Sequence, residues 1–125
     1  MSSRGVKLYL ADILEAIEKI GRYTRGTSFK DFAKDEKTVD AVLRNLAIIG
    51  EAAARIPDDY RSASPAVPWQ EIVGMRNKVV HEYFGVDEEI LWKTITEDLG
   101  GLEDQVRSMM VRNEAAAKLP PTSLL

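Results

Sequence analysis

Apolar positions recur along most of the chain at three- and four-residue steps, the period of a helix that is buried on one side. The first run predicts a helix over Val6–Ile20 that ends near residues 21–26. The second predicts a helix over Glu36–Ile56, which Pro57 terminates. Because this second helix is apolar on more than one side, we expect it to be central or to lie at a subunit contact.

Two further helices follow. Pro68-Trp69 opens a helix that should end near Phe84-Gly85, since proline suits the first turn and glycine the stop. Asp87 is a suitable N-cap for a fourth helix, and Gly100-Gly101 is expected to interrupt or bend that helix.

The connecting segments are polar and rich in turn residues, and the chain has no alternating strand pattern. Residues 24–35 are expected to form a loop or short turn that Phe29 and Phe32 pin to the core, and residues 57–68 a loop. The sequence therefore predicts an all-α, up-and-down bundle of four to five helices. It forms a single domain over residues 1–112, followed by a C-terminal tail over residues 113–125.

Composition excludes several functional classes. The chain has 125 residues, a net charge of −3 and no cysteine, so no thiolate is available and no global field attracts nucleic acid. Acidic residues interrupt the first apolar run, and no run reaches the roughly 18 residues that a membrane span needs. We expect a cytoplasmic protein without a membrane segment. One histidine and scattered carboxylates predict neither a metal site nor a cofactor.

The candidate chemistry lies in the stretch GMRNKVVHEYFG, residues 74–85, which contains the single histidine, His81. On a helical wheel Arg76 falls near the middle of the apolar side, where a guanidinium needs an anion. It either pairs with an internal carboxylate such as Glu51 or Asp40, or holds a phosphate through its planar fork. In the first case His81 caps the helix, and in the second it transfers protons.

Three further points concern the spacing in this stretch. Asn77 lies four residues before His81, so it is expected to orient the imidazole or contact phosphate, or else to be a plain surface residue. Arg76 and His81 are about 140° apart on an ideal helix, so a two-fold dimer would help to bring them into one site. Tyr83 follows Arg76 by seven residues and falls on nearly the same side of the helix.

The segment RNKVVHEY resembles the Arg-x4-His-x-Tyr motif of HepT-like toxins, a branch of the HEPN superfamily of helical ribonucleases. The segments DEKTVDAVLRNLAIIGEAAARIP and LWKTITEDL extend the resemblance over roughly Leu8–Val106. The resemblance implies a HEPN bundle that forms a homodimer and cuts RNA without metal, with Arg76 and His81 as the catalytic pair. Transfer RNA is among the reported target classes.

The resemblance also implies a partner, a minimal nucleotidyltransferase antitoxin of the MntA type that adds AMP to the motif tyrosine, here Tyr83. Two alternatives remain. One is a non-catalytic HEPN subunit that binds nucleotide or a nucleotidyltransferase partner. The other is a structural oligomer in which Arg76 forms an internal ion pair.

Overall fold

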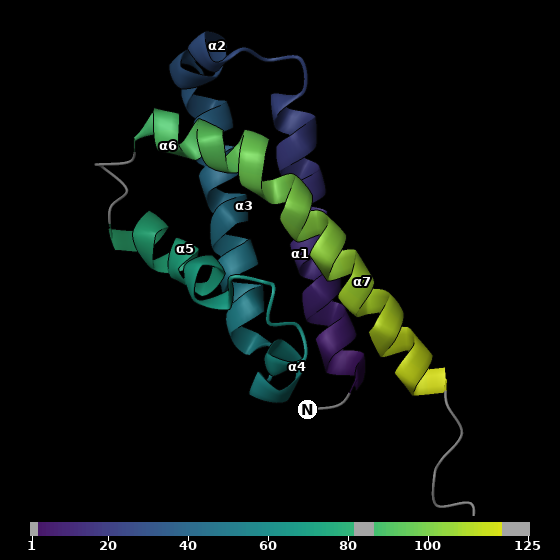
Figure 1. The fold of residues 1–125 in the computed structure, drawn as a ribbon. Helices are drawn as coiled ribbons and strands as arrows, with labels where there is room; N and C mark the ends of the chain where they lie inside the picture. The colour runs from purple at the N-terminus through teal and green to yellow at the C-terminus, as the bar shows by residue number, and fades with distance from the viewer. Residues whose placement is uncertain (1–2, 82–86, 119–125) are drawn as a thin grey trace, which may run out of the picture.

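The computed structural model describes residues 3–81 and 87–118, with side chains described for 5–77 and 87–115. Every regular element in that part of the chain is helical, which confirms the all-α fold class. The elements are α1 (Ser3–Thr24), α2 (Phe29–Lys34), α3 (Glu36–Arg55), α4 (Asp58–Ser62), α5 (Trp69–His81), α6 (Glu88–Lys93), the π-helical turn η2 (Thr94–Asp98) and α7 (Leu99–Lys118) (Figure 1).

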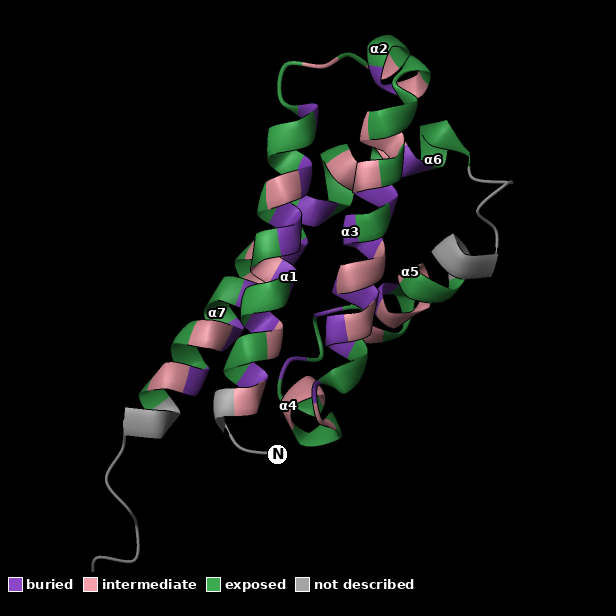
Figure 2. Ribbon diagram, turned by 180° about the vertical axis from the view of Figure 1, so that it is seen from behind, coloured by how far each residue is buried: buried purple, intermediate pink, exposed green. Residues whose placement is uncertain are grey.

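The long helix α3 lies in the middle of the bundle, as its broad apolar surface predicts. It packs against α1 on one side and against α5 on the other, while α7 runs along α1 and α6 approaches α2. In the view from behind, α1 and α3 lie in front of the rod formed by α6, η2 and α7 (Figure 2). The rod therefore covers only one side of these two helices.

Side-chain caps explain where the shorter elements begin. The Ser28 hydroxyl accepts a hydrogen bond from the Asp31 amide (3.1 Å) at the start of α2. Asp35 does the same for Thr38 (3.1 Å) at the start of α3. As predicted, Asp87 caps the fourth helix, where its carboxylate accepts from the Glu89 amide at 2.8 Å. Each cap satisfies an amide that the first helical turn leaves without a partner.

The core is formed by apolar side chains from α1, α2, α3, α5, α6 and α7. Phe32 is completely buried, and its ring lies 5.1 Å from that of Trp92 between centroids, while the half-buried Phe29 lies 6.2 Å from the same ring. The prediction that these phenylalanines pin residues 24–35 to the core is confirmed. The segment itself is a short helix, α2, rather than only a loop.

Three local predictions differ from the structure. The segment after Pro57 contains the short helix α4, because Asp58 and Asp59 favour the positive end of a helix. The pair Gly100-Gly101 lies inside α7, and the irregular turn comes just before it, at Thr94–Asp98. Helix α7 continues to Lys118, so residues 113–118, which we assigned to the tail, are helical. Within the described ranges, no helix combines the length and hydrophobicity needed to cross a membrane.

Candidate functional site

The position of Arg76 is determined by a close contact between α3 and α5. Gly50 of α3 lies so near α5 that a Cβ atom on it would be 2.9 Å from the Arg76 amide nitrogen and 3.1 Å from the Arg76 Cβ. Because glycine has only a hydrogen atom in place of a side chain, the backbones of α3 and α5 can approach closely at Gly50. The stem of Arg76 therefore starts at the helix–helix contact, which explains why the helical wheel puts this residue on the apolar side.

The side chain of Arg76 extends from this contact toward solvent and pairs with a carboxylate. Its Nη1 lies 2.9 Å from Glu51 Oε2, and 54% of the arginine side chain and 38% of the glutamate side chain are exposed. The long stem covers apolar surface while the charged head reaches water. The ion pair with Glu51 is the one we considered from the sequence, but solvent screens it, so it contributes little to stability.

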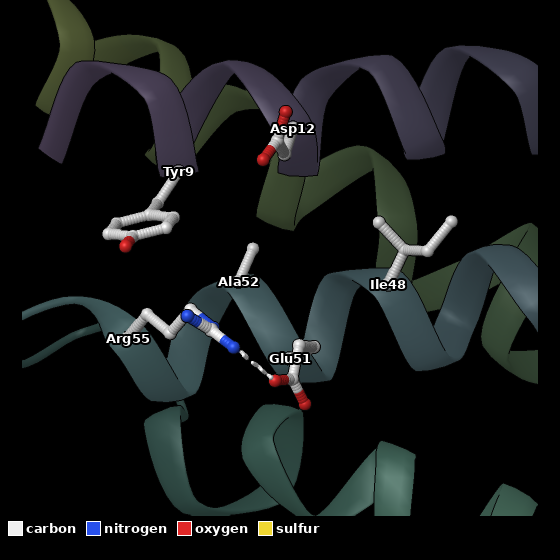
Figure 3. Close-up of a pocket in the computed structure, with 6 residues that line it drawn as sticks. All are labelled: Tyr9, Asp12, Ile48, Glu51, Ala52 and Arg55. Atoms are coloured by element: carbon white, nitrogen blue, oxygen red, sulfur yellow. Dashed lines mark hydrogen bonds and ion pairs between the residues drawn. The ribbon is translucent and has the colours of Figure 1, made fainter. Parts of the chain in front are cut away.

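Glu51 connects Arg76 to a second arginine. Its Oε1 accepts hydrogen bonds from Arg55 Nη2 at 3.1 Å and from Arg55 Nε at 3.3 Å, while Oε2 faces Arg76. The hydrogen bond with Glu51, with a smaller contribution from Tyr9, raises the pKa of Arg55 above its usual range. One carboxylate thus holds two guanidinium groups along the exposed side of α3. Figure 3 shows one of the two contacts, between Arg55 and Glu51.

The other predicted site residues are placed less completely. Asn77 follows Arg76 on α5 and its side chain is exposed. His81 is the last residue of α5, which agrees with a position in the last helical turn, but its side chain lies outside the described residues. Tyr83 lies outside the described residues altogether. The described side chains therefore bring Arg76 together with Glu51 and Arg55, and leave the pairing of Arg76 with His81 as a prediction.

A pocket next to these arginines was not predicted from the sequence. It has a volume of about 280 Å³ and is lined by Tyr9 and Asp12 from α1 and by Ile48, Glu51, Ala52 and Arg55 from α3. Figure 3 shows the Tyr9 side chain projecting from α1 toward α3 into this space. The three-residue and four-residue spacings place each set on one side of its helix. The sequence does not show that the two sides face each other.

Acidic groups do not converge on a metal site in the described part of the chain. No group of three or more histidine, cysteine, aspartate or glutamate side chains there is arranged to hold an ion. The polar chemistry of the described site therefore consists of two arginines, their shared carboxylate, an aspartate and a tyrosine hydroxyl.

Comparisons with known proteins agree on one family. The family model described as "Ribonuclease HepT-like" matches residues 13–109. A protein of Thermococcus cleftensis named "Probable ribonuclease HepT" is 48% identical over 106 residues, which cover 85% of this chain and 96% of the relative. Proteins of Caldanaerobacter subterraneus and Methanocaldococcus jannaschii, both provisionally named as RNases, are each 42% identical over 106 residues. The alignments cover 85% of this chain and 95% and 97% of these relatives. No solved structure matches the chain significantly.

Proposed function

The chain belongs to the HepT-like ribonuclease family, and from this premise we propose that it is a metal-independent endoribonuclease whose catalytic pair is Arg76 and His81. The observation that carries the proposal is the placement of Arg76. Its side chain is more than half exposed on α5, five residues before the histidine that ends the same helix. An exposed planar fork of this kind suits the recognition of a phosphate diester.

RNA supplies its own nucleophile, the 2′-hydroxyl. His81 accepts the proton of this hydroxyl, and the oxygen attacks the adjacent phosphorus. The bond from phosphorus to the 5′-oxygen breaks, that oxygen takes a proton, and the products are a 2′,3′-cyclic phosphate and a 5′-hydroxyl. Arg76 stabilises the added negative charge on the phosphoryl oxygens. DNA lacks the 2′-hydroxyl and is not cut.

The ion pair with Glu51 is compatible with this role of Arg76. A guanidinium carries five N–H donors, and Glu51 Oε2 engages Nη1. A phosphate oxygen can bind donors of the same fork while the glutamate holds its orientation. Because the pair is open to solvent, a phosphate can also displace the carboxylate at small cost.

A homodimer would complete the site. Positions five residues apart on an ideal helix project about 140° apart. A two-fold axis near α5 would therefore let the two copies combine Arg76 and His81. The second histidine is then available to protonate the leaving 5′-oxygen. Asn77, exposed next to Arg76, is proposed to support the imidazole or to contact phosphate.

We place this activity in a toxin–antitoxin system in the cytoplasm, with RNA, including transfer RNA, as the target. The antitoxin would be an MntA-type minimal nucleotidyltransferase that attaches AMP to Tyr83. If the helix continued to Tyr83, the seven-residue spacing from Arg76 would bring the phosphate of AMP to the side that carries Arg76, where it would block RNA. We expect Tyr83→Phe to keep the ribonuclease activity and to escape neutralisation. If the antitoxin still silences Tyr83→Phe, the modified residue is a different one.

The experiment is induction of the protein in a bacterial host that has no partner gene, followed by analysis of total RNA. Wild type should arrest growth and fragment RNA, while Arg76→Ala and His81→Ala should do neither. Arg107→Ala is the matched control, because Arg107 is an exposed arginine in an ion pair with Glu103 on α7. Purified wild type should cut RNA in EDTA and leave 2′,3′-cyclic phosphate ends. Dependence on added metal, or 3′-hydroxyl ends, would refute the mechanism.

A non-catalytic nucleotide- or partner-binding subunit is the second candidate. The net charge of −3 and the occupation of Nη1 by Glu51 favour it. It predicts that wild type cuts no RNA and that His81→Ala leaves binding of the partner unchanged. A purely structural role predicts that His81→Ala is silent in every assay.

A further inference from the structure

The pocket between α1 and α3 lies next to the proposed catalytic arginine. Glu51 belongs to both places, because it lines the pocket and forms the ion pair with Arg76 at 2.9 Å. Arg55 lines the pocket as well, and it hydrogen-bonds the other oxygen of the same carboxylate. A ligand whose phosphate binds at Arg76 can therefore extend its next group directly into this pocket.

The shape and lining of the pocket suit a nucleobase. At about 280 Å³ it lies just below the roughly 300 to 1,000 Å³ of pockets that hold drug-sized ligands, so it accepts a smaller planar group. Ala52 is almost fully buried and forms an apolar floor, and Ile48 is half-buried beside it. Unpaired RNA bases bind by stacking on aromatic rings and on arginine planes. The half-buried Tyr9 and the exposed Arg55 offer one surface of each kind.

The remaining polar group adds a preference among bases. Asp12 is exposed and lines the same pocket, one helical turn after Tyr9. A carboxylate accepts hydrogen bonds from the exocyclic amino groups of cytosine, adenine and guanine. Uracil presents only a ring N–H, so it is the weakest partner for Asp12.

We propose that this pocket is a base-binding subsite for the RNA nucleotide next to the scissile phosphate, with Tyr9 and Arg55 stacking on the base and Asp12 accepting from its amino group. This proposal rests on the proposed ribonuclease function, because it assumes that Arg76 holds a phosphate of the same strand. It adds residues from α1 to a site otherwise built on α5. The substrate is single-stranded RNA, since a paired base cannot enter the pocket.

The test measures RNA binding separately from RNA cleavage. The probe is a fluorescent single-stranded RNA oligonucleotide with 2′-O-methyl groups throughout, which lacks the nucleophile and cannot be cut. Tyr9→Leu should weaken its binding by about 5- to 150-fold, the loss typical of one base–aromatic stack. Tyr23→Leu is the matched control, because Tyr23 is also a partly exposed tyrosine on α1 but does not line the pocket.

Two further variants test the pocket from α3. Arg55→Gln should weaken binding, whereas Arg107→Gln should not, although Arg107 also pairs with a glutamate four residues earlier. Ala52→Leu fills the pocket without removing a polar group and should weaken binding as well. Circular dichroism at 222 nm checks that each variant is folded. An unfolded Ala52→Leu is replaced by Ala52→Val, which fills less of the space.

Cross-linking locates the base directly. An oligonucleotide with one 5-iodocytosine next to the phosphate should cross-link to Tyr9 on irradiation, and peptide mass spectrometry identifies the residue. In the binding assay, wild type should prefer adenine or cytosine over uracil at the position next to the phosphate, and Asp12→Asn should reduce that preference.

The outcomes separate this proposal from the proposed function. If wild type cuts RNA and Tyr9→Leu and Ala52→Leu bind the probe like wild type, the subsite is refuted and the ribonuclease stands. If the variants lose binding but wild type cuts nothing, the subsite stands and the catalytic proposal fails. Absence of binding by wild type overturns the subsite. A second result would also overturn the subsite: wild type is a dimer, and Tyr9→Leu makes it a monomer without changing its RNA affinity. In that case the pocket is covered by a second copy of the chain and not by a base.

Discussion

Gly50 permits the close approach of α3 and α5, and replacing it with alanine tests whether that approach positions Arg76. The added methyl group would lie 2.9 Å from the Arg76 amide nitrogen and 3.0 Å from the Ile72 carbonyl oxygen. Favourable contacts between carbon atoms lie at about 3.5–4.0 Å. The atoms in the way belong to a helix backbone and cannot rotate aside, so α5 must move away from α3.

Two opposing effects determine how much Gly50→Ala changes the free energy of unfolding. Alanine in a helix interior is favoured over glycine by about 1 kcal/mol. Overpacking a close contact typically costs about 1–3 kcal/mol. Gly74→Ala separates the two effects, because Gly74 lies inside α5 and a Cβ atom there would meet nothing within 4 Å. Gly74→Ala should therefore be stabilising, and Gly50→Ala should be less stable than Gly74→Ala by about 1–3 kcal/mol.

Unfolding of each variant in guanidinium chloride, followed by circular dichroism at 222 nm, measures this difference in stability. Both variants must be compared at equal protein concentration, since a dimer gains stability with concentration. Gly50→Ala should also cut RNA more slowly where it is folded, because a small displacement of a catalytic group can cost up to about 100-fold in rate. Equal or greater stability of Gly50→Ala than of Gly74→Ala would refute the argument that this contact is tight.

Three more predictions concern the scaffold. Phe32→Ala should lower the free energy of unfolding by about 3–5 kcal/mol, measured by denaturant unfolding, because it empties a fully buried position against Trp92. Trp69→Phe removes an indole N–H that donates to the Arg61 and Ser64 carbonyl oxygens, each at 3.0 Å, so amide exchange in α4 should become faster. Hydrogen bonds from the Thr38 hydroxyl and amide lower the pKa of Asp35, so this cap stabilises the fold above the unfolded pKa. That contribution is lost as the pH falls through the lower folded pKa. Asp35→Asn should therefore be less stable than wild type at pH 7, with a gap in melting temperature that closes toward pH 2.

Much of the scaffold could be predicted from local pattern. The period of apolar residues identified α1 and α3 to within a few residues at each end, since a helix buries one side every 3.6 residues. Short helices were harder. The predicted loops contain α2 and α4, whose few residues give too little periodicity to detect. The glycine pair, which was expected to interrupt or bend the fourth helix, does not interrupt α7, because packing of neighbouring side chains can override the low helix propensity of glycine.

The candidate site, like the scaffold, could be predicted only in part from the sequence. The motif residues from Arg76 to Tyr83 are close neighbours in the sequence, so the sequence alone indicated this stretch and its family. Whether Arg76 would be buried depended on how α5 packs. The structure shows the stem at Gly50 and the guanidinium in solvent with Glu51.

Local sequence thus determined the long helices, the Asp87 cap and the order of chemical groups along α5, because each depends on neighbours within about one helical turn. Only the tertiary structure decided that Glu51 joins Arg55 to Arg76, and that Tyr9 faces Arg55 across a pocket. Glu51 and Arg76 are 25 positions apart, and Tyr9 and Arg55 are 46 positions apart. Both contacts depend on the angle and distance at which whole helices pack.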